Sequence, residues 1–395
     1  MTQTTKGFRD GTDRLVPPAQ TLATVRPHLA AMGITRIANV TGLDVIGVPV
    51  VMACRPNSRG LSVSQGKGLT LDAARASAVM ETIESFHAEQ ITRPLVLGAA
   101  DELRTTHRLI DAGALGTVAA AHPFRSHAPL LWIEGVDLGT QEPTWVPFDA
   151  VHADFTTSTR MARRMFDVTT NGLASGNHYL EAVSHGLCEL IERDATARWA
   201  QLSPTEQDAT RLMLDTVDDP ACRRVFDLIT TAGARVAVWE LTSAAGLPVF
   251  RCDLAEDPDR ALRPIYTATG YGCHPRREIA LLRAVTEAAQ SRLSYIAGSR
   301  DDMFRREYER VSEVTAVTAT WRFVVEGAGV RDFTAAPTFQ LGSFAEDVAL
   351  AREALAAIGA GPVVVVDLSQ PRFEIPVVRV IVPGMRFHLR ATAAG

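Results

Sequence analysis

The pattern of apolar and polar positions along the chain predicts three long helices. The stretches 70–90, 178–201 and 276–298 repeat apolar residues every three or four positions, the spacing of one helix face. In the first stretch this face holds Ala74, Ala78, Val79 and Ile83. In the second it holds Ala182, Val183, Leu187, Leu190 and Ile191. These helices can therefore pack along one side and carry polar groups along the other.

Shorter apolar runs bounded by turn residues predict strands. We expect them within residues 35–51 (two strands about a Gly-rich turn), 130–151 (a hairpin), 235–254 (strand, turn, strand), 265–272, 363–367 and 376–382. Further elements are expected as helices over 21–32, 210–231 and 344–358, a polar arm over 1–20, a loop over 54–68, a peripheral segment over 94–129 and a polar loop through Arg164. Because no linker separates these elements, the expected fold class is α+β, with residues 1–395 forming one large unit.

Composition narrows the class of protein. The chain has 395 residues, 46% hydrophobic and 22% charged, which suits a globular protein with a large core. Its net charge of −5 gives no general electrostatic reason to bind nucleic acid. The five cysteines lack C-x-x-C spacing, which favours reduced thiols in the cytoplasm over a zinc site. We find no signal peptide and no apolar run of about 18 residues, so neither secretion nor a membrane span is expected.

Carboxylates follow the polar faces of the first two predicted helices. The first face carries Ser77, Glu81 and Glu84, and the second carries Glu181, His185, Glu189 and Glu192. Carboxylates in a row repel one another, and Mg²⁺ relieves that repulsion while it bridges to phosphates. If the two helices face each other, four glutamates surround one or two metal ions. A solvated acidic face is the simpler alternative, and an iron site is a weaker one because its Glu-x-x-His partners are missing.

The familiar nucleotide-binding motifs are absent from the sequence. The spacing from Gly60 to the Gly66-Lys67 pair is one residue too long for a P-loop, and Gly68 stands where Ser or Thr is needed. Two interpretations of the Gly66–Gly68 segment stay open. It is either a turn with a solvated lysine or a backbone nest that aims Lys67 at a phosphate.

The third predicted helix adds a face of mixed charge. It places Arg283, Glu287 and Gln290 on one side, with Arg292 nearby. This face is either a surface ladder of ion pairs or part of a site. Among the scattered histidines, His185 is the best placed for a catalytic role, since it shares the acidic face of the second helix.

Three segments of the chain together resemble the signature segments of the YcaO superfamily. They span residues 40–89, 171–195 and 287–293 and occur in the family's order, within a similarity over about residues 6–385. YcaO proteins have a characteristic α+β fold and an ATP site unrelated to P-loops, and they phosphorylate a peptide-backbone amide oxygen so that a nucleophile can replace it. The resemblance implies an N-terminal arm and strands over 1–60, a nucleotide-site core over 61–300 and a C-terminal α/β part over 301–395.

The resemblance also assigns roles to single residues. The first family motif falls on Ser77, Glu81 and Glu84, but Ser85 stands where the family has an arginine. The second and third motifs fall on Glu181, Glu189, Glu192 and Arg193, with Asn171 or Asn177 before them, and on Glu287, Gln290 and Arg292. The implied Mg²⁺ ligands are Glu81, Glu84, Glu189 and Glu192, and the implied catalytic residues are Glu287, Gln290 and Arg193. The implied contacts to ATP come from Lys6, Arg14, Arg55, Ser64, Lys67, Ser77, Asn171, Glu181, Arg193, Gln290 and Arg292. Whether Glu287 and Gln290 face the nucleotide or the reacting amide stays open.

The nucleophile is inferred from a further part of the resemblance. Azoline-forming YcaO enzymes often end in a Pro-rich tail, whereas this chain ends PGMRFHLRATAAG. The chain is most similar to YcaO enzymes that work with a TfuA partner and use sulfide to install thioamides. We therefore expect ATP- and Mg²⁺-dependent thioamidation of a peptide or protein by a cytoplasmic homodimer with a TfuA-like partner. The alternatives are an azoline-forming cyclodehydratase, an amidine-forming macrocyclase and an inactive substrate-binding subunit, which Ser85 favours.

Overall fold

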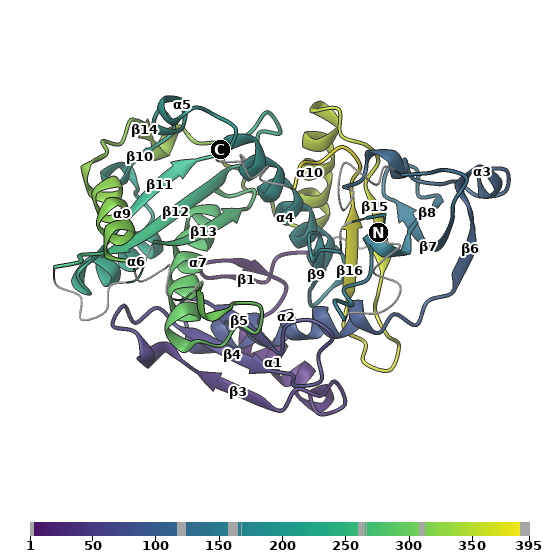
Figure 1. The fold of residues 1–395 in the computed structure, drawn as a ribbon, viewed down its shortest axis with the longest axis horizontal. Helices are drawn as coiled ribbons and strands as arrows, with labels where there is room; N and C mark the ends of the chain where they lie inside the picture. Colours follow the sequence, from purple (N-terminus) through teal and green to yellow (C-terminus); the bar gives the residue numbers. More distant parts are fainter. Residues whose placement is uncertain are drawn as a thin grey trace.

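The computed structural model describes residues 4–116, 124–156, 165–166, 168–259, 265, 267–306, 308 and 313–387. In these residues three main sheets surround three long helices (Figure 1). The helices are α2 (Leu71–Glu89), α4 (Tyr179–Trp199) and α7 (Arg277–Ala297), which confirms the three helices predicted from the apolar spacing. The fold class is α+β, as expected. The predicted polar loop through Arg164 lies mostly outside the described residues.

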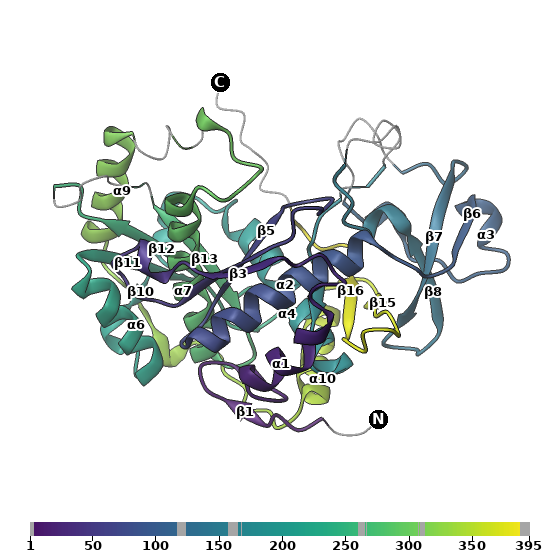
Figure 2. The same cartoon turned by 90° about the horizontal axis from the view of Figure 1, so that it is seen from below.

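The N-terminal segment is more regular than the predicted polar arm. Strands β1 (Phe8–Arg9) and β2 (Asp13–Arg14) form a small antiparallel pair, and α1 (Pro18–Val25) follows. The helix expected over 21–32 thus begins and ends earlier. Pro18 favours the start because its fixed φ suits the first helical position. Pro27 lacks an N–H, so the chain continues only as a short 3₁₀ turn, Arg26–His28. Figure 2 shows α1 beside α2.

One three-stranded sheet packs directly against α2. It consists of β3 (Arg36–Asn39), β4 (Val50–Cys54) and β5 (Val63–Lys67), all antiparallel. The loop predicted over 54–68 is therefore wrong for residues 63–67, and Lys67 ends an extended strand rather than sitting in a backbone nest. The reason is close packing, since a Cβ on Gly66 would lie 2.0 Å from the Ala78 amide nitrogen and 2.3 Å from the Ala74 carbonyl oxygen. Glycine here lets the helix backbone approach the strand.

A second three-stranded sheet packs against α7 in the same way. It consists of β11 (Ala234–Glu240), β12 (Val249–Glu256) and β13 (Ala268–Cys273). A Cβ on Gly272 would lie 2.1 Å from the Ala280 carbonyl oxygen of α7. Alternation along β11 divides the core, because Val238 packs toward α7 while Trp239 packs toward α4.

Smaller elements surround this second sheet. They are α5 (Pro204–Asp208), α6 (Pro220–Thr231) and α9 (Val314–Glu326), together with the parallel pair β10 (Leu212–Met213) and β14 (Arg331–Asp332). The helix predicted over 210–231 is wrong in its first half. Asp219 caps the Cys222 amide at 2.9 Å and Pro220 occupies the first turn, and both features set the helix start there.

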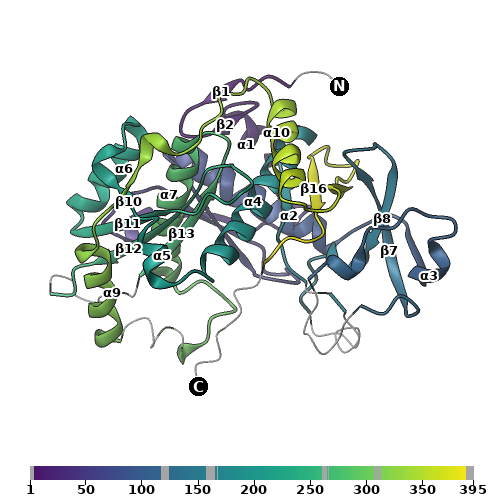
Figure 3. The same cartoon turned by 90° about the horizontal axis from the view of Figure 1, so that it is seen from above.

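The third sheet has six strands and is covered on both faces. It consists of β6 (Leu95–Ala99), β7 (Pro129–Asp137), β8 (Pro143–Pro147), β9 (Leu173–Ser175), β15 (Val364–Asp367) and β16 (Val377–Ile381), with α3 (Ala100–Leu103) after β6. The order is β6-β7-β15-β16-β9, with β8 also paired to β7, which confirms the predicted hairpin and C-terminal strands. Along β15, Val364 packs with α2, while Val365 packs with α4 and α10 (Phe344–Ala357). Figure 3 shows α10 beside α4.

The central helices connect the sheets. Helix α2 contacts β4 and β5 of one sheet and β9 of another, and α7 contacts β13 and β5. Helix α4 contacts β9, β16 and β13. The polar faces of all three helices therefore meet between the sheets. Within the described ranges, no helix is both long and apolar enough to cross a membrane.

Candidate functional site

The start of each acidic helix is fixed by a cap. Thr70 Oγ1 accepts a hydrogen bond from the Ala73 amide at 3.2 Å at the start of α2. His178 Nδ1 accepts one from the Leu180 amide at 3.1 Å at the start of α4. His178 is therefore the N-cap of α4. Both caps satisfy amides that lack partners inside the helix, so the register of the glutamates along each helix is set locally.

Glutamates from α2 and α4 turn toward β9 and the residue before it. Glu84 Oε1 accepts hydrogen bonds from the amide and the hydroxyl of Ser175, at 2.8 and 2.7 Å. Glu189 Oε2 accepts one from the Gly172 amide at 3.0 Å. These two contacts join α2, β9 and α4. Backbone amides that hold a carboxylate favour its charged form and fix its direction.

The carboxylates of the site lie close enough to disfavour one another's charge. Burial, together with the charges of Glu81 and Glu189, raises the pKa of Glu84 to about 8, although hydrogen bonds from Ser175 act in the opposite direction. Loss of bulk water also raises the pKa of Glu81 to about 7, although this residue keeps an exposed surface, so Glu81 lies at the edge of the group. The group therefore crosses from α2 to α4.

The α4 side of the group is buried. Burial raises the pKa of Glu192 to about 7, with a further contribution from Glu287 of α7, and it also raises the pKa of Glu189. Glu192 is 4% exposed and Glu181 is 2% exposed. The alternative of a solvated acidic face is therefore wrong for α4, since buried carboxylates without a compensating cation are costly.

Helix α7 adds the fifth carboxylate of the group, Glu287, and Lys67 at the end of β5 neutralises it. Glu287 Oε2 lies 2.7 Å from Lys67 Nζ, and Glu287 Oε1 accepts a hydrogen bond from the Tyr271 amide at 3.2 Å. Burial would raise the pKa of Glu287, but Lys67 and Arg193 outweigh burial and lower it. Gln290 Nε2 donates to the Gln65 carbonyl at 3.3 Å, and its Oε1 has no partner within the described chain.

Arginines surround the carboxylates. Arg193 Nη2 lies 3.7 Å from Glu189 Oε1 and 4.0 Å from Glu192 Oε1. Arg14 Nε lies 3.7 Å from Glu181 Oε1. Glu181 also accepts a hydrogen bond from the Leu15 amide at 3.2 Å, so it ties the N-terminal segment to α4. Two of the residues expected to meet phosphates, Arg14 and Arg193, therefore lie beside the acidic group.

Arg283 is a member of this site that the sequence did not assign. Its Nη2 lies 3.0 Å from His185 Nε2, and its charge acts on Glu189 and Glu192. Burial and the charge of Arg283 hold the pKa of His185 well below its usual value, so this imidazole is neutral and accepts from the guanidinium. The available signal was the position of Arg283 one turn before Glu287 on the same helix face.

Three cations expected to contact ATP are paired elsewhere. Lys6 Nζ is buried between Asp13 and Asp347, at 2.9 and 2.8 Å. Arg55 pairs with Glu89 at 2.5 Å, and Arg292 pairs with Asp44 at 3.0 Å and with Glu256 at 2.9 Å. These pairs give the three cations structural partners, and their nucleotide contacts stay predictions.

The remaining predicted residues lie on the elements that frame the site. Ser64 is buried on β5, Ser77 is half-buried on α2, and Asn171 precedes β9. Ser85, which replaces the family arginine, donates its hydroxyl hydrogen to the Glu81 carbonyl at 3.1 Å. The serine therefore uses its hydroxyl on its own helix.

The donor set fits Mg²⁺ in chemistry. Among the described residues, no three His, Cys, Asp or Glu side chains stand close enough together to hold a metal ion as they lie. The carboxylates instead accept hydrogen bonds from backbone amides or pair with cations. Glu84 accepts from the Ser175 amide, and Glu287 pairs with Lys67. Their oxygens are the ligands that Mg²⁺ prefers. The raised pKa values of Glu84 and Glu192 show that their charged forms are disfavoured, and a divalent cation bound beside them would favour those charged forms.

Comparison with known proteins gives a family match over most of the chain and relatives over nearly its full length. A family model described as YcaO cyclodehydratase, ATP- and Mg²⁺-binding, matches residues 65–386. An uncharacterised protein in the tfuA 3′ region of Rhizobium leguminosarum bv. trifolii is 37% identical over 386 residues, covering 96% of this chain and 90% of that protein. An uncharacterised protein of Methanothermobacter thermautotrophicus is 33% identical over 378 residues, covering 94% of each.

Two solved structures resemble the chain over nearly its full length. YcaO from Methanopyrus kandleri bound with AMPPCP and Mg²⁺ has a TM-score of 0.75 at 25% identity, covering 97% of this chain and 94% of that one. A heterocyclase in complex with substrate and cofactor has a TM-score of 0.79 at 20% identity. That match covers 98% of this chain but 54% of the heterocyclase, so this chain spans about half its length and shares its fold.

Proposed function

Because the chain belongs to the YcaO family, we propose that it uses ATP and Mg²⁺ to phosphorylate a peptide-backbone amide oxygen, which sulfide then replaces. The observation that carries the proposal is the group of glutamates on α2, α4 and α7. Burial raises the pKa of its α2 and α4 members, and cations border the group. The 25% identical YcaO bound with AMPPCP and Mg²⁺ supports the choice of ligands.

The roles follow from charge and position. Glu81, Glu84, Glu189 and Glu192 are proposed to hold Mg²⁺, which supplies positive charge against the phosphates when bound. Arg14, Lys67 and Arg193 border the carboxylates and are proposed to orient the phosphate oxygens. Glu287 holds Lys67 in place, and the unpartnered Oε1 of Gln290 is free to accept a hydrogen bond from nucleotide or peptide.

The proposed reaction has two steps. The amide oxygen attacks the γ-phosphorus of ATP, the bond to the bridging oxygen breaks and ADP leaves, which gives an O-phosphorylated amide. Hydrosulfide then adds to the amide carbon, the carbon–oxygen bond breaks, and phosphate leaves with the thiol proton as C=S forms. An amide oxygen is a poor leaving group until it is phosphorylated, so the protein mainly positions and neutralises charge.

The choice of sulfide and of a TfuA-like partner is supported by one relative. The Rhizobium protein found in the tfuA 3′ region is 37% identical over 96% of this chain. We propose that this chain shares a TfuA association and therefore the thioamide-forming branch of the chemistry. The homodimer stays a prediction that light scattering on the purified chain tests.

The test is a mass measurement on the product. The full chain, a TfuA-like partner, ATP, Mg²⁺ and sulfide are incubated with candidate peptides encoded near its gene. A product heavier by the exchange of oxygen for sulfur supports the proposal. A product lighter by one water points to the second candidate, an azoline-forming cyclodehydratase, which the description of the family model favours. If no peptide gives a product and no ATP is consumed, the result favours an inactive substrate-binding subunit.

A further inference from the structure

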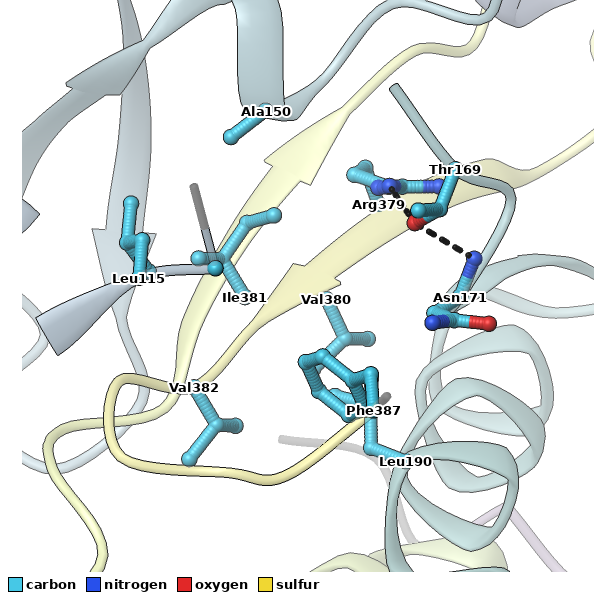
Figure 4. A pocket seen from close by; sticks show the side chains of 11 residues that line it. Leu115, Ala150, Thr169, Asn171, Leu190, Arg379, Val380, Ile381, Val382 and Phe387 are labelled. Carbon is cyan, nitrogen blue, oxygen red and sulfur yellow. Dashed lines mark hydrogen bonds between the residues drawn. The ribbon is translucent and has the colours of Figure 1, made fainter. Parts of the chain in front are cut away.

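A small cavity lies between α4 and β16. We call this cavity the Arg379 pocket, and the residues that line it include Thr169, Asn171, Leu190, Arg379 and Val380 (Figure 4). About 50 Å³ inside it is open to the centres of water molecules. A single water needs about 10–15 Å³ by that measure. The pocket therefore suits a small ion with one or two waters, and it is too small for a nucleotide or a peptide.

The pocket has a buried charge without a full set of partners. Arg379 is 2% exposed, and within the described chain its Nε and Nη1 have no hydrogen-bond partner. Its Nη2 donates to Thr169 Oγ1 at 3.3 Å, and Thr169 Oγ1 also accepts from the Asn171 amide at 3.3 Å. Figure 4 shows Arg379 beside Thr169, with apolar side chains around the rest of the pocket. Burying a guanidinium with two unpaired N–H donors costs folding free energy unless an anion binds to it.

The pocket adjoins the proposed metal ligands through consecutive residues. Leu190 lines the pocket, and the preceding residue, Glu189, accepts from the Gly172 amide. The Gly172 carbonyl in turn accepts from the Val380 amide at 2.8 Å, directly after Arg379. Arg379 and Glu189 also influence each other's charge. One layer of chain therefore separates an anion on Arg379 from the carboxylate group.

We propose that the Arg379 pocket binds a small, weakly hydrated monoanion, and that it holds hydrosulfide for the reaction proposed above. This role rests on the proposed function. Its apolar walls disfavour strongly hydrated ions such as phosphate, because they offer little to replace lost water. Hydrosulfide is soft and carries one charge, and a guanidinium favours it over neutral hydrogen sulfide. The pocket thus raises the local concentration of the nucleophile near the activated amide.

Bromide tests the pocket without any turnover. Crystals of the full chain soaked in sodium bromide are expected to show anomalous signal at hydrogen-bond distance from the Arg379 guanidinium. Arg379→Met is expected to abolish that signal and to melt at the same or a higher temperature, since it removes a poorly paired buried charge. A wild-type crystal without bromide in the pocket overturns the proposal.

Sulfide kinetics then test the role of the anion. In Arg379→Met the KM for sulfide is expected to rise about tenfold or more. The KM for ATP is expected to change much less, because Arg379 acts on Glu189 only through its charge. Arg379→Lys is expected to recover part of the loss. Bromide is expected to compete with sulfide in wild type. Arg372→Met is the control, because this arginine is exposed and packs on Phe373. An unchanged KM for sulfide in Arg379→Met overturns the sulfide role. If wild type forms no thioamide, the proposed function fails separately, while the bromide crystals still decide whether the pocket binds anions.

Discussion

Lys67 Nζ lies 2.7 Å from Glu287 Oε2, and this ion pair joins the end of β5 to the middle of α7. The two residues are 220 positions apart, and they reach the site from a strand and a helix. Both side chains are partly exposed, at 21% and 26%, so the pair can open toward a ligand. Lys67 also lowers the pKa of Glu81, so a single ammonium serves both α2 and α7.

Replacing Lys67 with methionine is expected to lower kcat/KM for ATP by about tenfold or more, because a charge-assisted contact and the neutralisation of Glu287 are lost together. Initial rates of ADP release measure it. Arg75→Met removes an exposed cation from the same α2 neighbourhood and is expected to leave the rate near wild type. Equal rates for Lys67→Met and Arg75→Met would contradict the role given to Lys67.

Nucleotide binding is expected to depend on Glu189. Mg²⁺ with a non-hydrolysable ATP analogue, at about 100 times its Kd, stabilises a folded protein by about 2.7 kcal/mol. Wild type should therefore melt at a higher temperature with this ligand, and Glu189→Gln should lose most of the shift. Glu353→Gln, on the exposed side of α10, is the matched control. If Glu189→Gln keeps the full shift, Glu189 does not hold the metal.

The stability of the ligand-free chain is expected to fall as pH rises. A carboxyl with a raised folded-state pKa contributes fully below its unfolded value, and it loses that contribution as pH passes its folded value. For Glu84 this window runs from about 4.5 to about 8, and for Glu192 it ends near 7. Thermal melts across this range in a chelator measure the fall.

Mg²⁺ with nucleotide should reduce that fall, because the cation takes the place of the proton. Glu84→Gln should flatten the ligand-free profile, since it removes the carboxyl with the higher raised pKa. The assignment of Glu84 is refuted by a ligand-free wild type whose melting temperature is constant across this window.

Gly66→Ala is expected to destabilise the fold by about 1–3 kcal/mol, because overpacking against a helix backbone cannot be relieved by a side-chain shift. The added Cβ would lie 2.0 Å from the Ala78 amide nitrogen. Gly42→Ala is the control, since its Cβ would meet nothing within 4 Å. Denaturant unfolding of both variants measures the difference, and similar midpoints would show that α2 can move away from β5.

The sequence was sufficient to predict the parts of the site that lie on single helices. The three-and-four spacing that defines α2, α4 and α7 also places Glu81, Glu189 and Glu287 on polar faces, and all three enter the same acidic group. Capping at Thr70 was predictable for the same reason, because a cap acts on its own first turn.

What the sequence did not predict depends on contacts between distant segments. β5 was interpreted as a loop because Gly66 is typical of turns, yet here the glycine makes room for Ala74 and Ala78. Lys6 looked like a phosphate ligand, and only the packing of α10 shows that Asp347 already holds it. The sequence also offered no indication of the Arg379 pocket, because the residues that line it come from segments far apart in the chain.

The buried ion pair between Lys6 and Asp347 sets an order for folding. Residue 6 emerges from the ribosome long before residue 347. The backbone amide of Lys6 likewise donates to the Gly342 carbonyl, which is also synthesised much later. The segment around Lys6 is thus synthesised 341 positions before its partner, and it cannot reach its final place until Asp347 has also been made. Arg14, which lies 3.7 Å from Glu181 in the same segment, would then join the acidic group late, and a half-made chain would lack this cation beside α4.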